Sequence, residues 1–256
     1  MAFLELGDHR LSRGDVQDLL ATDHPMVEQF RFDKQNEAKG QRVDFGLVIV
    51  PKRGVRYLQQ RDSSGRRVEP AWRKLSGREG IGQGNRSIWV SGGEMQAANH
   101  TFFPNQEFND LGIGSALYVA MERLYRQLGV RMVSLLAVDV GVYVWARQAF
   151  AFQDPTEVDS LIPPLERFLH GHGAPVAVDE DRLVESWDFA NYDVPDLSID
   201  DYRVGKAFML DCVSGWYGVK YLDDEKHSRV AEASRRETFA RLPDKIDGAS
   251  ADLAVR

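Results

Sequence analysis

The segment from Asn109 to Phe152 constrains the fold more strongly than any other part of the chain. Two glycines, Gly112 and Gly114, stand one residue apart and lead directly into "SALYVAMERLYRQLG". In this run the apolar residues recur at i, i+4, i+7 and i+11, the spacing of one face of an amphipathic helix: Leu117, Met121, Leu124 and Leu128. Gly129 is a natural C-terminal stop for that helix. The pattern therefore predicts a glycine loop followed by a long surface helix.

Strands are predicted on both sides of this helix. "VRMVSLLAV" is nearly continuous in apolar residues, as expected of a strand covered on both faces, and Asp139 is placed to cap the next helix, "VGVYVWARQAF". Upstream, "RSIWVSGGEMQAANHTFFP" predicts two strands joined by a turn at 91–93, and Pro104 ends the second. "DFGLVIV" is a further short strand. The order is strand, loop, helix, strand, helix.

Three regions follow from the change of pattern along the chain. Residues 1–40 are predicted as short helices, "DVQDLLA" and "PMVEQFRF", and residues 41–152 form the core. Residues 153–256 form a C-terminal α/β extension or small domain. It should hold a helix interrupted at Pro163–Pro164, a strand pair turning near Ser214–Gly215, and a final amphipathic helix. The expected class is α/β (α+β), with a mixed, mostly antiparallel sheet flanked by helices.

Composition limits the environment and the partners. The chain has one cysteine, Cys212, which excludes an intrachain disulfide. No apolar run reaches the roughly 18–20 residues of a membrane span. We therefore expect a cytoplasmic protein without membrane contact. The net charge of −7 disfavours nucleic-acid binding by the whole surface. A basic segment, residues 52–86, carries ten Lys or Arg against three acidic residues and leaves nucleic-acid binding as an alternative.

The glycine loop is the part of the sequence with the clearest chemistry. A helix start leaves its first amides unpaired and carries a partial positive charge, so a glycine loop before it can bind a pyrophosphate. A Rossmann site would need a third glycine where Leu117 stands, and a phosphate-binding P-loop would need a Gly-Lys-Ser/Thr that is missing. No metal site is predicted, because His170 and His172 have no further ligands at suitable spacing.

These motifs resemble the GNAT superfamily, the acyl-CoA-dependent N-acetyltransferases. That family's loop reads Gln/Arg-x-x-Gly-x-Gly/Ala, which "NDLGIG" matches with Asn109 at the Gln/Arg position. Its last helix ends in an aromatic-x-x-x-Gly-Phe pattern, to which "WARQAF" is similar, with Ala149 at the glycine position. The clearly patterned resemblance covers roughly 60 residues.

The resemblance implies acetyl-CoA as co-substrate, a primary amine as acceptor and direct acetyl transfer. It implies that the strand at Phe102 and Phe103 pairs with the pantetheine arm, and that the loop holds the pyrophosphate through these residues: Asn109, Leu111, Gly112, Ile113, Gly114 and Ser115. Candidate bases are Glu94 and His100. The tyrosine that serves as acid in many relatives is replaced by Trp145, which cannot donate such a proton, and Tyr143 is the candidate substitute.

The resemblance leaves two hypotheses about function open. The chain is either an active N-acetyltransferase or a GNAT-like fold used as a binding or regulatory module, as Trp145 and Asn109 suggest. The expected partners are the amine substrate and, as one option, a second copy of the chain in a homodimer.

Overall fold

The computed structural model describes residues 3–52, 82–104, 111–174, 177–200 and 202–242. The chain divides into two compact units, which are described one at a time. The first holds Met1–Arg131 together with Glu237–Arg256, and the second holds Met132–Arg236.

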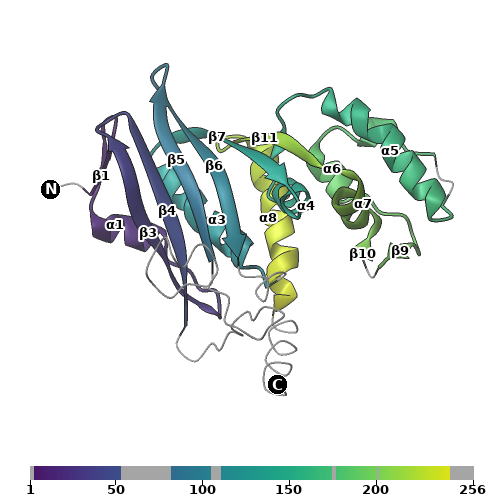
Figure 1. The fold of residues 1–256 in the computed structure, drawn as a ribbon, viewed down its shortest axis with the longest axis horizontal. Helices are drawn as coiled ribbons and strands as arrows, with labels where there is room; N and C mark the ends of the chain where they lie inside the picture. The colour runs from purple at the N-terminus through teal and green to yellow at the C-terminus, as the bar shows by residue number, and fades with distance from the viewer. Residues whose placement is uncertain (1–2, 53–81, 105–110, 175–176, 201, 243–256) are drawn as a thin grey trace, which may run out of the picture. The chain divides into compact units, whose positions relative to one another are not determined.

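The first unit is built on four antiparallel strands that pair in sequence order. They are β3 (Val27–Ala38), β4 (Arg42–Pro51), β5 (Gly82–Ser91) and β6 (Glu94–Pro104) (Figure 1). A small hairpin of β1 (Leu4–Leu6) and β2 (His9–Leu11) precedes them. The mostly antiparallel, mixed α/β class predicted from the sequence is confirmed.

The turn between β5 and β6 lies where the sequence places it. Gly92 and Gly93 have φ of 60° and 83°, and Ser91 pairs with Glu94 across the turn. A two-residue hairpin turn needs positive φ at both central residues, which glycine adopts without strain. β5 begins at Gly82, four residues before Arg86, where the predicted strand starts.

Two helices cover one face of these strands, α1 (Arg13–Leu19) and α3 (Ile113–Gln127) (Figure 1). The predicted apolar stripe of α3 is buried, with Met121, Leu124 and Leu128 fully inaccessible. Gly129 follows the helix with a φ of 72°, the left-handed conformation expected of a C-terminal stop. The prediction for this helix is confirmed.

The helix predicted over "PMVEQFRF" is wrong, because Val27–Ala38 is the strand β3. Val27 and Phe30 are three residues apart and both buried, which resembles a helical spacing. A bulge between Val27 and Gln29 shifts the strand's alternation by one residue and produces that spacing. Backbone pairing with β4 therefore makes this segment a strand and not a helix.

In the second unit, β11 (Gly215–Tyr221) pairs antiparallel with β7 (Val130–Val138) on one side and with β8 (Ala151–Phe152) on the other. Its helices are α4 (Gly141–Arg147), α5 (Glu157–Gly171), α6 (Ser186–Ala190), α7 (Val204–Cys212) and α8 (Glu225–Ala240). The last turn of α8 belongs to the first unit. A 3-10 turn at Glu180–Arg182 and the strand pair β9 (Ser198–Ile199) and β10 (Tyr202–Arg203) complete the unit.

Three predictions for this unit are wrong. β7 is covered on one face only, since Leu136 and Val138 are each 47% exposed. α5 continues through Pro163 and Pro164, because the carbonyls that lose their helical partners belong to residues 159 and 160, which are exposed and can bind water. The first strand of the predicted pair before Ser214 is the helix α7.

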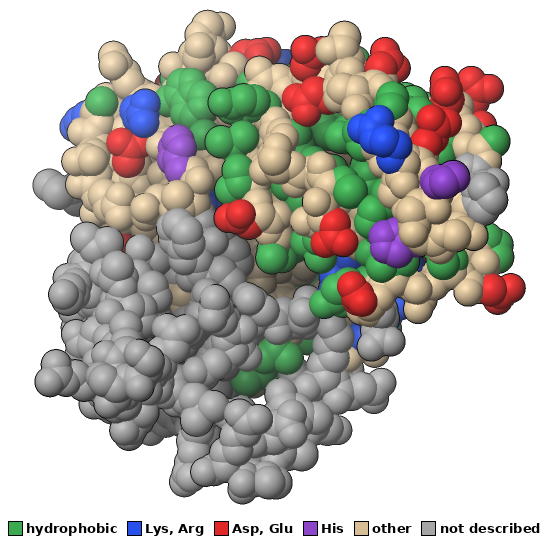
Figure 2. All heavy atoms as spheres, turned by 45° about the vertical axis from the view of Figure 1, so that its right-hand side comes forward, with side chains coloured by type: hydrophobic (Ala, Val, Ile, Leu, Met, Phe, Trp, Pro, Cys, Tyr) green, Lys and Arg blue, Asp and Glu red, His purple; other side chains and the backbone are tan. Residues whose placement is uncertain are grey.

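The surface of the second unit is rich in acidic groups on one side. Asp and Glu side chains gather at the upper right of Figure 2, over the part of the unit that holds α5. None of the helices in the described ranges has the length and apolarity that crossing a bilayer requires.

Candidate acyl-CoA site

The glycine loop has the backbone conformation that an anion site needs. Gly112 is the residue before α3, with a left-handed φ of 72°, and it provides no side chain to cap the helix. The first bond within the helix runs from the Ala116 amide to the Gly112 carbonyl, over 3.0 Å. The amides of Ile113 and Gly114 therefore have no acceptor within the helix. Gly112 and Gly114 are half-buried, whereas Leu111 and Ile113 are buried.

The end of the chain's last helix lies against this loop. A Cβ atom placed on Gly112 would stand 3.2 Å from Leu242 Cδ2 and 3.4 Å from Thr238 Cγ2. Leu242 is itself buried. The left-handed φ and this contact both favour glycine at position 112, and Leu242 closes one side of the loop.

A cavity of about 860 Å³ opens beside the loop, along the outer face of α3. Its walls combine apolar groups of α3, of the end of α8 and of the chain just after α8 with the polar segment between α1 and β3. They include Ala116, Val119, Phe239, Leu242 and Asp23. Arg123 is held in its wall by donating from Nε to the Leu19 carbonyl over 3.0 Å. The volume is within the range of ligand pockets.

His24 connects the segment between α1 and β3 to the glycine loop. Its Nε2 lies 2.8 Å from the Leu111 carbonyl oxygen, and its Nδ1 accepts from the Met26 amide over 3.2 Å. The second bond requires a lone pair on Nδ1, so the proton of the neutral ring is on Nε2. Burial lowers the pKa of His24, and the bond to Leu111 only partly offsets this. A neutral His24 thus fixes the residue just before Gly112.

The second part of the candidate site is a bulge in β6 at His100. Asn99 pairs with Arg86 and Thr101 pairs with Asn85, so His100 is one extra residue on β6. Asn99 is buried and accepts from the Tyr125 hydroxyl of α3 over 2.8 Å, whereas His100 is exposed. A bulge re-aims a side chain next to a functional site in many proteins. Here the extra residue on β6 is His100, whose imidazole bonds to Ser87 on β5.

His100 ends a chain of hydrogen bonds that crosses three strands. Its Nε2 lies 2.7 Å from Ser87 Oγ on β5, and Ser87 Oγ lies 2.6 Å from Asp44 Oδ1 on β4. Arg42 donates from Nε to the same Asp44 oxygen over 2.9 Å and from Nη2 to Ser87 Oγ over 3.3 Å. Ser87 is only 2% exposed, so the middle of the chain is shielded from water.

Charges and burial set the ionisation of this group. Burial raises the pKa of Asp44, but hydrogen bonds from Ser87 and Arg42 outweigh it and hold that pKa below its ordinary value. Burial lowers the pKa of His100, Arg42 and Arg86 lower it further, and Asp44 opposes them. His100 is therefore neutral at physiological pH, the state that a general base requires.

Arg86 supports the bulge from the α3 side of the sheet. Its Nη1 donates to the carbonyls of Asn85, over 2.7 Å, and Thr101, over 2.5 Å, the two residues that pair across the strands next to the irregular register. The side chain is buried beside Tyr118 and Tyr125, and burial lowers its pKa. A Cβ at Gly84 would stand 3.0 Å from Nη1, so that glycine leaves room for the guanidinium.

The other predicted base, Glu94, lies at the opposite end of β6. At about 3.4 Å per residue, it is roughly 30 Å from the end of the strand that leads toward the glycine loop. It forms an ion pair of 2.8 Å with Arg131, and both side chains are exposed. The structure does not bring Glu94 together with the loop, and His100 is the base candidate nearer to it in the chain.

The residues after β7 differ from the prediction in one respect. Asp139 does not cap α4: it has a left-handed φ of 51°, and Val140 occupies the capping position without a side-chain bond. Trp145 packs edge-on against Phe150, with ring centroids 5.4 Å apart. Tyr143 lies below Lys206, whose Nζ is 5.7 Å from the ring centroid.

Ala149 has a backbone conformation that favours glycine. Its φ is 61°, a left-handed conformation just after α4. Lys220 donates from Nζ to the Gln148 carbonyl over 2.8 Å, and His227 Nδ1 lies 2.8 Å from the Ala149 carbonyl oxygen. These two groups, together with the helix dipole, stabilise the end of α4.

Several predicted features lie outside what the structure describes. Asn109 and most of the basic segment 52–86 are outside the described residues, and of Phe102 and Phe103 only the backbone strand β6 is described. Ser115 is the third residue of α3 and is nearly buried. Within the described residues, no three His, Cys, Asp or Glu side chains gather as a metal site would require.

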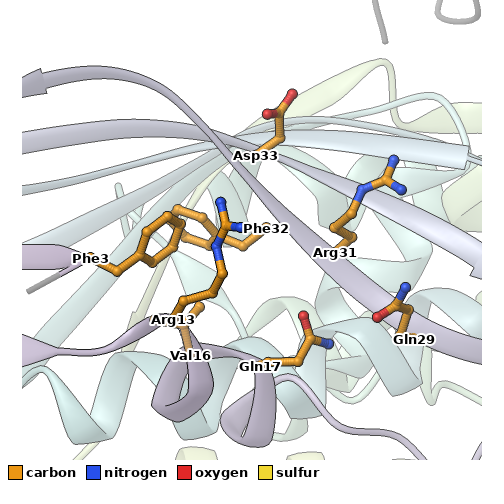
Figure 3. A pocket seen from close by; sticks show the side chains of 8 residues that line it. All are labelled: Phe3, Arg13, Val16, Gln17, Gln29, Arg31, Phe32 and Asp33. Carbon is orange, nitrogen blue, oxygen red and sulfur yellow. The ribbon is translucent and has the colours of Figure 1, made fainter. Parts of the chain in front are cut away.

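A second cavity, of about 370 Å³, lies between α1 and the edge strand β3 (Figure 3). Arg13 and Gln17 of α1 line it, together with Arg31 and Asp33 of β3. Arg13 also lies over the Phe3 ring, 5.1 Å from its centroid. β3 and β6 are separated by β4 and β5, so this cavity is remote from the bulge at His100.

Sequence reasoning missed Asp44, Ser87 and Arg42. None of the three belongs to a motif that the sequence makes recognisable, and 43 residues separate Asp44 from Ser87. Only the pairing of Asp44 with Ser87 across two neighbouring strands brings them together. The polar residue that opens "DFGLVIV" was the one available signal.

Comparison with known proteins adds no assignment, since the chain matches no protein-family model and no curated protein at a significant level.

Proposed function

We propose that this chain is an acyl-CoA-dependent N-acetyltransferase that acetylates a primary amine by direct transfer. The observation that carries the proposal is the start of α3. A left-handed Gly112 without a capping side chain leaves the Ile113 and Gly114 amides for a pyrophosphate. The dipole of the 15-residue helix adds a partial positive charge at the same place.

The acceptor amine would lose its proton to His100. The amine nitrogen then attacks the thioester carbonyl, a C–N bond forms and the C–S bond breaks. The thiolate takes a proton from Tyr143 or from water. A base on an exposed bulge of the strand before the glycine loop, neutral at physiological pH, suits the first of these steps.

Acetyl-CoA binding and free-thiol release test the proposal separately. We expect acetyl-CoA to bind in calorimetry, and thiol release with at least one member of a panel of primary amines. His100→Gln should lower kcat/KM by roughly 10²–10⁴ and leave the Kd for acetyl-CoA unchanged. Gln35→Ala is the matched control, because Gln35 contacts Asn85 in the same sheet and is not bonded to His100. Absence of acetyl-CoA binding at millimolar concentration would reject the proposal.

Two observations favour the alternative of a GNAT-like module without turnover. Leu242 closes one side of the loop at Gly112, and Trp145 stands where many relatives have the acid tyrosine. Acetyl-CoA binding without thiol release on any amine would support this alternative over the enzyme.

A further inference from the structure

The two hydrogen bonds that join Asp44, Ser87 and His100 determine which side chain donates each proton. Two bonds join the three side chains, and the Ser87 hydroxyl has one proton. Asp44 also accepts from Arg42 and is an ionised carboxylate, so it has no proton to donate. Ser87 must therefore donate to Asp44, and the second bond requires a proton on His100 Nε2.

We propose that Ser87 and Asp44 are positioning residues that hold His100 in the tautomer whose Nδ1 is the base. The inference rests on the proposed acetyl transfer and names the atom that receives the proton. Ser87 fixes the ring through Nε2–H, and the Nδ1 lone pair is left for the amine. Because Ser87 is buried, water competes poorly for that bond.

The same chain stabilises the ring after it has taken the proton. The N–H bond of the amine breaks, an Nδ1–H bond forms, and the imidazolium then carries a positive charge. Asp44 attracts that charge through Ser87, whereas Arg42 on β4 and Arg86 on β5 repel it. The basicity of His100 is thus a balance between one carboxylate and two guanidinium groups.

Titration of the His100 ring by NMR tests this balance without any substrate. Asp44→Asn removes the attraction and should lower the His100 pKa by roughly half a unit to one unit. Arg42→Gln removes a repulsion and should raise it by a similar amount. Gln35→Ala, on the neighbouring strand β3, should leave it unchanged. The spectrum of His100→Gln assigns the ring signal.

The acid limb of kcat/KM should move in the same directions, since His100 must be neutral to act. In Asp44→Asn it should move to lower pH and in Arg42→Gln to higher pH. Ser87→Ala should lower kcat/KM by less than His100→Gln does, and its neutral ring should show both tautomers in long-range proton–nitrogen spectra.

The outcomes separate the role of Ser87 and Asp44 as positioning residues of His100, called the relay below, from the proposed function. A His100 pKa that stays constant in both Asp44→Asn and Arg42→Gln, or a native ring with its proton on Nδ1, would overturn the relay. Opposite pKa shifts in the two variants, together with a native ring that has its proton on Nε2, would establish it. Such shifts in a protein that releases no thiol with any amine would instead reject the acetyltransferase and leave the relay standing.

Discussion

Replacing Gly112 by alanine should weaken acetyl-CoA binding and also destabilise the fold modestly. Gly112 has a φ of 72°, a conformation that costs a residue with a Cβ roughly 1–2 kcal/mol. The new methyl group would meet Leu242 and Thr238 at 3.2 and 3.4 Å. Both contacts are with side-chain methyl groups, which can move by a few tenths of an ångström, so the strain dominates the loss of stability.

The effect on binding follows from the amides after Gly112. If the strain rotates one amide away from the pyrophosphate, one hydrogen bond to a charged group is lost, worth about 1.5–3 kcal/mol. The Kd measured by calorimetry should rise by about ten- to 150-fold. Gly40→Ala is the matched control, because Gly40 has the same φ of 72° and nothing lies within 4 Å of its Cβ position.

Urea unfolding should show a similar loss of stability in the two variants, about 1–2 kcal/mol each. Only Gly112→Ala should change the Kd, and Gly40→Ala should stay within twofold of the native protein. Equal affinity in both variants would show that the Gly112 loop does not hold the pyrophosphate.

Three further predictions use other parts of the structure. Arg86→Met should lower the free energy of unfolding by about 2–4 kcal/mol, because two carbonyls at the bulge lose their donor. The control Arg10→Met, at an exposed side chain, should change that free energy by less than about 1 kcal/mol. Equal urea midpoints for the two variants would contradict the role of Arg86. Because the pKa of His24 is lowered in the folded state, its neutral form stabilises the fold above about pH 6.5, and this contribution is lost as pH falls below that value. His24→Gln should therefore flatten the pH dependence of the free energy of unfolding between pH 7 and 5. A slope as steep as that of the native protein would refute this. Tyr143→Phe should lower kcat for thiol release by about tenfold or more while acetyl-CoA still binds, and an unchanged kcat would assign the leaving-group proton to water.

Elements with strong local signals follow from the sequence. The apolar stripe and Gly129 define α3 and its end, and two adjacent glycines define the turn between β5 and β6. These features need only neighbouring residues, because side-chain spacing and glycine's access to positive φ act within a few positions. The glycine loop, and with it the proposed pyrophosphate site, is recognisable for the same reason.

Tertiary structure alone decided the rest. Val27 and Phe30 have a helix-like spacing but lie in the strand β3, because β4 provides backbone hydrogen-bond partners and a bulge places both side chains on the buried face. Asp44, Ser87 and His100 acquire their relation only from the register of three strands and the extra residue in β6. The sequence names His100 as a candidate base. Hydrogen bonds between residues far apart in the chain depend on distances that no local pattern encodes, so only the fold connects His100 to Ser87 and Asp44.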